Sequence, residues 1–322
     1  MNRRNCLRFL FALTLAAAAG IAAAQPGKTV RLLVGFPAGG APDAVARAFA
    51  DQMRQATGQA VVVENKPGAS GKLAIDELRN ARADGDTIAV IPASILALTP
   101  QVLKSARYDP VNDFVGLGSL AEYGFGVAAG PASGATDIAG YKAWAAKHPK
   151  DSNFATPGVG TPQHFLGAQL QKALGVELTH IPYKGGASAV TDVIGGQVAL
   201  LITTEQLLVP YEGQKLHTLF ITSARPNPRM PKVPTAREVG MPQLESTDWF
   251  GLFVQAGTPQ AKVDEWRAAV AKITASPAYI AAMKNLGFSV PAKQPVDFIE
   301  PVKAAVAAWG RRVKLANFNA MD

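Results

Sequence analysis

Four short loops of this sequence could bind an anion through their backbone amides. They consist mostly of Gly, Ala, Ser, Thr and Pro, and each leads from a strand-like run into a helix start; they cover residues 36–43, 67–72, 156–164 and 184–188. The first turn of a helix has unpaired N–H groups and the positive end of the helix dipole, which favour a carboxylate without any charged side chain. Taken singly, each loop also fits an ordinary strand–helix turn.

Motifs typical of catalysis or metal binding are incomplete. The four histidines are scattered, and no His-Glu-x-x-His spacing occurs. Residues 68–72 resemble a phosphate loop, but Lys66 replaces its first glycine and Leu73 stands where Ser or Thr should bind magnesium. Gly158 and Gly160 lack the third glycine of a dinucleotide fingerprint, and no Gly-x-Ser-x-Gly elbow occurs. We therefore expect no cofactor, no metal and no enzymatic activity.

Residues 1–24 have the pattern of a secretory signal. Arg3, Arg4 and Arg8 precede an apolar run over residues 9–21, and the alanines at 22–24 fit a cleavage site after Ala24. The apolar run is shorter than the roughly 20 residues that a spanning helix needs. We therefore expect a periplasmic protein, with Sec and Tat export both open.

Composition limits the possible partners of the mature chain. The only cysteine, Cys6, lies in the leader, so disulfides and thiolate sites are excluded after cleavage. Losing three arginines lowers the formal net charge from +8 to +5, and no basic run marks a nucleic-acid surface. Cleavage of 24 residues from 322 leaves 298, which favours two domains. We expect a monomer that binds no nucleic acid.

Strand-like and helical patterns alternate along the chain, which is typical of an α/β fold with a largely parallel sheet. Parallel strands place the loops that follow them at one edge, and a cleft between two domains can bring two such edges together. The stretch between Pro92 and residue 124 is expected to be irregular. The expected strands are 30–35, 60–64, 87–91, 125–129, 152–155, 177–181, 198–203, 219–222 and 250–254. The expected helices are 42–57, 72–82, 138–148, 163–174 and 187–194, followed by two that start at Pro259 and Pro295.

An ordered set of segments resembles the Bug family, the TctC-like periplasmic receptors of tripartite tricarboxylate transporters. The segments extend over nearly the whole mature chain in the family's order. They are Val-Arg-Leu-Leu-Val-Gly-Phe-Pro-Ala-Gly-Gly at 30–40, Val-Val-Val-Glu-Asn-Lys-Pro-Gly-Ala-Ser-Gly at 61–71, Tyr-Asp-Pro-Val-Asn-Asp-Phe at 108–114, His-Ile-Pro-Tyr-Lys-Gly at 180–185, Val-Pro-Thr-Ala-Arg-Glu-Val-Gly at 233–240, Trp-Phe-Gly-Leu at 249–252 and Ala-Gly-Thr-Pro at 256–259.

The resemblance implies a type II periplasmic-binding-protein fold with the ligand cleft between two domains. The chain would cross between the domains near residues 124–129 and 249–254, so that domain 1 comprises 25–126 and 250–322 and domain 2 comprises 127–249. The implied function is capture of a small organic carboxylate and its delivery to the membrane permease of such a transporter. The implied ligand-binding residues are Phe36, Pro37, Ala38, Gly39, Gly40, Asp43, Ala69 and Ser70 of domain 1, with Thr161, His164, Gly185, Gly186 and Ser188 of domain 2.

The sequence departs from the family pattern around the expected pocket. Pro42 replaces a threonine at the first helix start, Thr161 replaces a serine, and Glu205 is an added acid that we include among the ligand-binding candidates. Asp43 also fits a helix-capping role, and His164 and Glu205 also fit structural or surface positions. Two other functions stay open: an enzyme that uses Asp43, His164 or Glu205 as acid or base, and a receptor that hands its ligand to a signalling partner.

Overall fold

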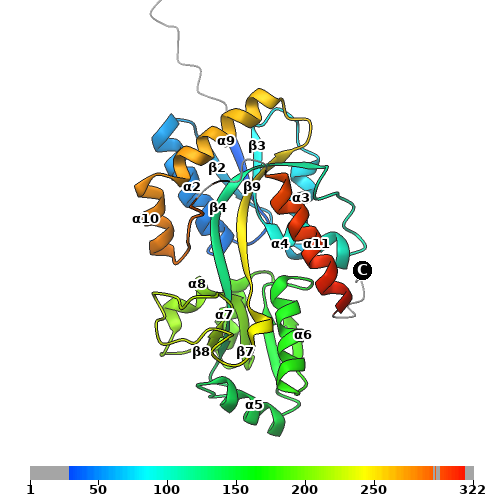
Figure 1. Cartoon of the computed structure of the whole chain (residues 1–322), viewed down its shortest axis with the longest axis vertical. Helices are drawn as coiled ribbons and strands as arrows, with labels where there is room; N and C mark the ends of the chain where they lie inside the picture. Colours follow the sequence, from blue (N-terminus) through cyan, green and yellow to red (C-terminus); the bar gives the residue numbers. More distant parts are fainter. Residues whose placement is uncertain (1–28, 293, 295–297, 316–322) are drawn as a thin grey trace, which may run out of the picture.

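The computed structural model describes residues 29–292, 294 and 298–315, so the expected leader, residues 1–24, lies outside the described residues. Two groups of strands and helices lie one above the other in Figure 1. They are joined by the long strands β4 (Phe114–Ala129) and β9 (Thr247–Gln255). The expected alternation of strands and helices is confirmed. Among the described residues, no helix combines the length and the apolar run needed to cross a bilayer.

The first lobe contains a five-stranded sheet in the order β2-β1-β3-β9-β4. Strands β1 (Val30–Val34), β2 (Val61–Asn65) and β3 (Thr87–Pro92) are parallel, and β9 runs antiparallel to β3 and β4. Both faces of the sheet are buried, since Leu32 packs into one core cluster and Leu33 into another. The helices of this lobe are α2 (Ala41–Thr57), α3 (Lys72–Arg79), α4 (Ala93–Val102), α9 (Gln260–Thr274), α10 (Pro277–Leu286) and α11 (Ile299–Leu315).

The second lobe contains the remainder of the sheet. Strand β4 pairs with β9 up to Gly124. From Phe125 onward it pairs with β7, and from Gly126 onward it also pairs with β8. The strands of this lobe are β5 (Asn153–Thr156), β6 (Thr179–Pro182), β7 (Leu200–Thr204) and β8 (His217–Ile221), and its helices are α5 (Ile138–Lys147), α6 (Pro162–Leu174), α7 (Gly186–Ile194) and the short α8 (Glu205–Leu208). The division of the chain at 126/127 and 249/250 stays a prediction.

Helix α2 forms as its sequence pattern predicts. Pro42 lies in the first turn, where a missing N–H costs no hydrogen bond, and Gly58 ends the helix with a left-handed φ of 72°. Val45, Phe49 and Met53 recur at helical spacing and are buried. The buried face fixes the direction in which the start of α2 points.

The region between Pro92 and residue 124 is more regular than expected. Helix α4 follows β3 directly and contains Pro100, which has no N–H to donate to the carbonyl of Leu96. The Tyr108 hydroxyl donates to that carbonyl instead, at 3.1 Å. The Tyr108 side chain, eight residues after Pro100, therefore supplies the hydrogen bond that Pro100 cannot donate. A local sequence pattern does not reveal this compensation.

Strand β4 begins at Phe114, well before the expected start at 125. Glycines obscure its pattern because they carry no side chain to alternate. A Cβ at Gly116 would lie 2.0 Å from the ring of Phe298, and one at Gly118 would lie 2.4 Å from Val270. These glycines let a helix and an aromatic side chain pack directly on the strand. Helix α10 was likewise not expected.

Candidate functional site

A cavity lies between the two lobes. It contains about 570 Å³ of space, part of it open to solvent, which is within the range of small-molecule sites. No Asp, Glu, Lys, Arg or His belongs to its lining among the described residues. The lining comprises Phe36, Pro37, Gly40, Ala41, Pro42, Pro92, Ser94, Ile95, Tyr123, Pro157, Thr161, Pro162, Gln163, Gly185, Gly186, Ala187, Ser188, Thr203, Thr204, Leu207 and Phe250.

Asp43 holds the loop that precedes α2. Its buried carboxylate accepts hydrogen bonds from the Gly39 amide at 3.0 Å, from Asn65 at 2.9 Å and from Arg47 at 3.0 Å. Burial raises the pKa of Asp43, but the bonds from Arg47, Gly39 and Asn65 outweigh it, so the pKa is held below its usual value. Gly39 adopts a φ of 80°, a conformation that favours glycine. Asp43 lies outside the lining and positions the loop that does form it.

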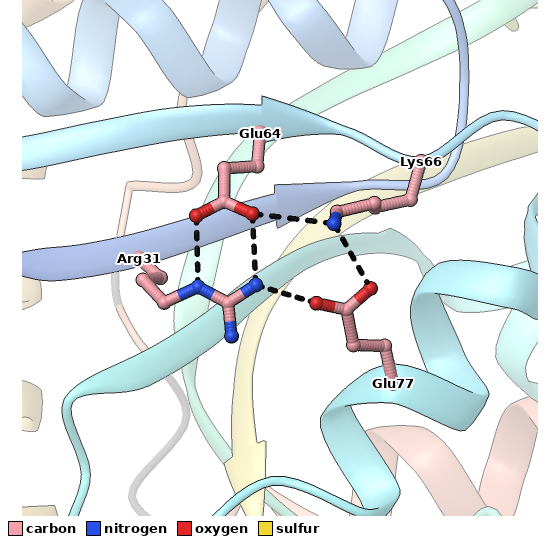
Figure 2. A network of polar contacts seen from close by, with 4 residues as sticks. All are labelled: Arg31, Glu64, Lys66 and Glu77. Atoms are coloured by element: carbon pink, nitrogen blue, oxygen red, sulfur yellow. Dashed lines mark hydrogen bonds and ion pairs between the residues drawn. The ribbon is translucent and has the colours of Figure 1, made fainter.

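An ion-pair network fixes the second loop of this lobe at both ends. Arg31 on β1 binds Glu64 on β2 and Glu77 on α3, and Lys66 lies 3.4 Å from Glu64 and 3.3 Å from Glu77 (Figure 2). The hydrogen bond from Arg31 lowers the pKa of Glu64 to about 2. Two cations and two anions balance each other, so the network adds no net charge to the cleft. It connects the strands to α3 on either side of residues 67–71.

Ser70 lies at the tip of that loop and contacts the other lobe. Its hydroxyl donates to the Val159 carbonyl at 2.6 Å, and a Cβ on Gly158 would lie 2.5 Å from the same hydroxyl. Ala69 and Ser70 both have positive φ, 45° and 56°, which is strained for residues with a Cβ. They line a second cleft that adjoins the cavity at Phe36 and Pro157. The loop is thus held in an unusual conformation at the point where the lobes meet.

Two stacked histidines support the loop that precedes α6. The rings of His164 and His180 lie 3.8 Å apart, His164 Nδ1 accepts from the Gly160 amide at 3.2 Å, and His180 Nε2 lies 2.7 Å from the Thr156 hydroxyl. Burial lowers the pKa of His164 to about 4; burial and His164 lower that of His180 to about 3. Both rings are therefore neutral near pH 7. Thr161 caps α6 by accepting from the His164 amide.

The start of α7 has no side-chain cap. It begins after Gly185, and a Cβ on Gly186 would lie 2.7 Å from the Thr203 hydroxyl oxygen. Thr203 is fully buried, yet its hydroxyl and that of Thr204 have no hydrogen-bond partner among the described residues. Buried polar groups are nearly always paired, and both threonines line the cavity, so their hydroxyls could bond to a group placed there. The start of α7 and the Thr203 hydroxyl thus lie side by side in the cavity lining.

Glu205 follows Thr204 directly but does not belong to the lining. Its buried carboxylate accepts from the Ser223 hydroxyl and, at 2.8 Å, from Asn227. Burial raises the pKa of Glu205, and these two hydrogen bonds oppose the rise. The acid connects α8 to the segment after β8.

The structure therefore separates the expected ligand-binding residues into three groups. Phe36, Pro37, Gly40, Thr161, Gly185, Gly186 and Ser188 line the cavity. Ala69 and Ser70 line the adjoining cleft. Ala38, Gly39, Asp43, His164 and Glu205 lie outside both linings.

Sequence reasoning missed several lining residues, including Ser94, Tyr123, Thr203, Thr204 and Phe250. Thr203 and Thr204 end β7 directly before α8, and Ser94 is the second residue of α4, which follows β3 directly. These strand–helix junctions contain no glycine, so a search for glycine-rich loops passes over them. The junction itself, independent of composition, was the usable signal.

The two lobes are in contact around the cavity. Besides Ser70, Gln206 donates to the Gly287 carbonyl at 3.0 Å and Arg229 donates to the Asn285 carbonyl at 2.7 Å. On another side, the rings of Phe165 on α6 and Trp309 on α11 lie 5.8 Å apart. Figure 1 shows α11 extending from the first lobe toward α6. Contacts from several elements therefore surround the cavity. Within the described residues, no cluster of His, Cys, Asp and Glu could hold a metal ion.

Comparison with known proteins gives concordant matches. Residues 45–318 match the family described as "Tripartite tricarboxylate transporter family receptor". The chain is 31% identical over 303 residues to the UPF0065 protein in the tcbD-tcbE intergenic region of Pseudomonas sp. (strain P51), which covers 92% of this chain and 89% of that protein.

Two solved structures have the same arrangement of elements. Periplasmic binding protein BugD superposes with a TM-score of 0.86 at 31% identity, over 91% of this chain and 99% of that one. The protein Rpa4515 of R. palustris, solved with adipate, superposes with a TM-score of 0.86 at 28% identity, over 92% of this chain and 100% of that one.

Proposed function

Because the chain belongs to the TctC family of tripartite tricarboxylate transporter receptors and has the two-domain fold of periplasmic binding proteins, we propose that it captures a small organic carboxylate between its lobes and delivers it to a membrane permease. The observation that carries this proposal is the cavity end formed by α7 and Thr203. Uncapped helix amides and an unpaired buried hydroxyl are all donors, which suits a carboxylate.

The first lobe supplies another part of the proposed carboxylate site. Gly40 and Ala41 begin α2, and Pro37 lies close enough to Gly185 that a Cβ there would be 2.9 Å from the proline ring. Two helix starts from different lobes therefore converge on one cavity. The contacts of Ser70, Gln206 and Arg229 would close the lobes over a bound ligand, and the permease could then distinguish loaded from empty receptor.

The chemistry of the lining supports binding without catalysis. General acid–base catalysis needs a titratable side chain within hydrogen-bond reach of the substrate. Among the described residues the lining contains no carboxylate, imidazole or amine, and the Tyr123 hydroxyl, which does line the cavity, donates its hydrogen to Asp248. The three acid–base candidates are engaged elsewhere: Asp43 with Arg47, His164 with His180, and Glu205 with Asn227. We accordingly propose that the protein is not an enzyme.

The cellular context is part of the same proposal. Residues 1–24 would direct export and be removed after Ala24, and the mature monomer would act in the periplasm. The residues proposed to contact the ligand are those at the starts of α2, α6 and α7, together with Thr203 and Thr204. The other expected residues would hold these loops in place.

A thermal-shift screen tests the proposal directly. The mature chain, starting at Gln25, is screened against mono- and dicarboxylates at millimolar concentration, each beside its uncharged amide. A ligand present at 100 times its Kd stabilises the native state by about 2.7 kcal/mol. We expect at least one carboxylate to raise the melting temperature while its amide does not, and calorimetry to confirm one site. If no carboxylate shifts the melting temperature, the proposed function is wrong.

A further inference from the structure

A buried carboxylate, that of Asp248, lies directly behind two residues of the cavity lining. Asp248 at the start of β9 is almost fully buried and does not itself belong to the lining. Its Oδ1 accepts from the Ser94 amide at 3.2 Å and from the Trp249 amide at 2.9 Å. Its Oδ2 accepts from the Tyr123 hydroxyl at 2.8 Å and from the Ser94 hydroxyl. Ser94 and Tyr123 do line the cavity.

These hydrogen bonds determine what the two hydroxyls can offer to a ligand. Four donors converge on Asp248, which fits its ionised form, although burial raises its pKa against the effect of the hydrogen bonds. A hydroxyl has one hydrogen and two lone pairs. Since Ser94 and Tyr123 give their hydrogens to Asp248, they offer only lone pairs to a ligand. This wall can accept hydrogen bonds and cannot donate them from its hydroxyls.

The charge behind this wall is balanced by no adjacent cation among the described residues. The hydrogen-bonding partners of Asp248 are two hydroxyls and two backbone amides, all neutral. Burial lowers the pKa of Arg312, and the charge of Asp248 opposes this effect. Within the described part of the chain, Arg312 makes no hydrogen bond or ion pair with Asp248, and it lines a different cavity beside Phe165 and Trp309. A second anion placed against Ser94 and Tyr123 would meet lone pairs and, behind them, a negative charge.

The remaining lining is largely apolar. The rings of Tyr123 and Phe250 stack with centroids 4.3 Å apart, and Ile95, Leu207 and Phe36 also face the cavity. An aliphatic or aromatic carbon skeleton suits these side chains. The cavity lining thus offers donors at α7, apolar side chains, and acceptors at Ser94 and Tyr123.

We propose, on the premise that the cavity binds a carboxylate as described above, that the ligand is a monocarboxylate whose other end carries a hydrogen-bond donor, a hydroxyl or an ammonium group. Ser94 and Tyr123 accept from that donor. Asp248 does not touch the ligand, but it orients both hydroxyls and thereby excludes a second carboxylate. Specificity arises here from an unfavourable contact with the wrong ligand as much as from a favourable one with the right ligand.

Titration calorimetry with matched ligand series tests this specificity. Each series shares one carbon skeleton: hexanoate, 6-hydroxyhexanoate, 6-aminohexanoate and adipate; butyrate, 4-hydroxybutyrate, 4-aminobutyrate and succinate; benzoate, 4-hydroxybenzoate, 4-aminobenzoate and terephthalate. In the series that binds best, we expect a hydroxyl or amino member to bind at least about tenfold more tightly than the dicarboxylate. Preference for the dicarboxylate overturns this inference alone, whereas failure of every member to bind overturns the proposed function as well.

Two substitutions test the role of the hydrogen-bond direction. In Asp248→Asn, the new side-chain amide donates to one of the two hydroxyls, whose own hydrogen can then point into the cavity. The ratio of the affinity for the hydroxyl or amino ligand to the affinity for the dicarboxylate should therefore fall at least about tenfold. Tyr123→Phe removes one acceptor and should weaken binding of the donor ligand while leaving the plain monocarboxylate unchanged. This second variant keeps the inference testable if Asp248→Asn does not fold.

A matched control separates these effects from general damage. Asp192 accepts from the Tyr183 hydroxyl at 2.7 Å and does not belong to the cavity lining. Asp192→Asn therefore alters the same kind of tyrosine–aspartate bond at a distance from the ligand, and the ratio of affinities within each series should not change. Equal ratios in the wild type, Asp248→Asn and Tyr123→Phe would show that the wall does not select the ligand.

Discussion

Replacing Thr203 by valine tests the seat proposed for the carboxylate, because it removes the hydroxyl and keeps the shape. The hydroxyl is fully buried and has no hydrogen-bond partner among the described residues, so its loss breaks no hydrogen bond with them. An unsatisfied buried polar group costs about 1–3 kcal/mol, and we expect Thr203→Val to keep or slightly raise the melting temperature. A hydrogen bond to a charged group contributes about 1.5–3 kcal/mol, so the affinity should fall about 10- to 150-fold.

The assay combines thermal unfolding without ligand and calorimetry with the best carboxylate from the screen. Thr191→Val is the control: Thr191 is exposed on α7, and its hydroxyl donates to the Ala187 carbonyl within the helix. We expect that variant to bind normally. Unchanged affinity in Thr203→Val would refute contact between this hydroxyl and the carboxylate, and a marked fall in melting temperature would refute the claim that the hydroxyl is unpaired.

Three further predictions concern the framework around the cavity. Ser70→Ala removes the 2.6 Å hydrogen bond to the second lobe, so the affinity for the ligand should fall about fivefold and X-ray scattering should show a larger radius of gyration without ligand. An unchanged radius would show that the Ser70 hydrogen bond does not hold the lobes together. The pKa values of His164 and His180, about 4 and about 3, lie below the unfolded value of about 6.5, so their contribution to stability is full above that pH and is lost as the pH falls toward 4. Urea unfolding from pH 7 to 4 should show this loss, and His180→Asn should flatten it. Tyr108→Phe leaves the Leu96 carbonyl of α4 unpaired and should lower the free energy of unfolding by about 1–3 kcal/mol in urea; no change would mean that water replaces the hydroxyl.

Most of the strands and helices, and the half of the expected ligand-binding residues that line the cavity, could be predicted from the sequence, because they depend on local signals. The loop 36–43 combines glycine, a proline in the first helical turn and an acid, and the structure places its residues as a helix start at the cavity. Thr203 and Ser94 carry no such signal, since a threonine at the end of a buried strand has the same pattern whether or not a ligand reaches it. Only the fold shows that they face one cavity.

Long-range contacts account for the rest. Asp248 lies 154 residues from Ser94 and 125 from Tyr123 along the chain, so no spacing rule connects them. Asp43 illustrates the opposite case, because a capping acid and a ligand contact have the same sequence pattern. In the structure, the Asp43 carboxylate accepts hydrogen bonds from Gly39, Asn65 and Arg47 and does not belong to the cavity lining.

The continuous path of β4 and β9 has a mechanical consequence. Both strands extend from the first sheet toward the second, and β4 is hydrogen-bonded to neighbours from Phe114 to Ala129 without an intervening loop. Separating the lobes must therefore bend a pair of antiparallel strands instead of reorienting a slack linker. Gly124 and Gly126 lie at the place where β4 exchanges partners, and a glycine weakens the interior of a strand. We therefore expect the bending stiffness of these two strands to limit how far the lobes can separate.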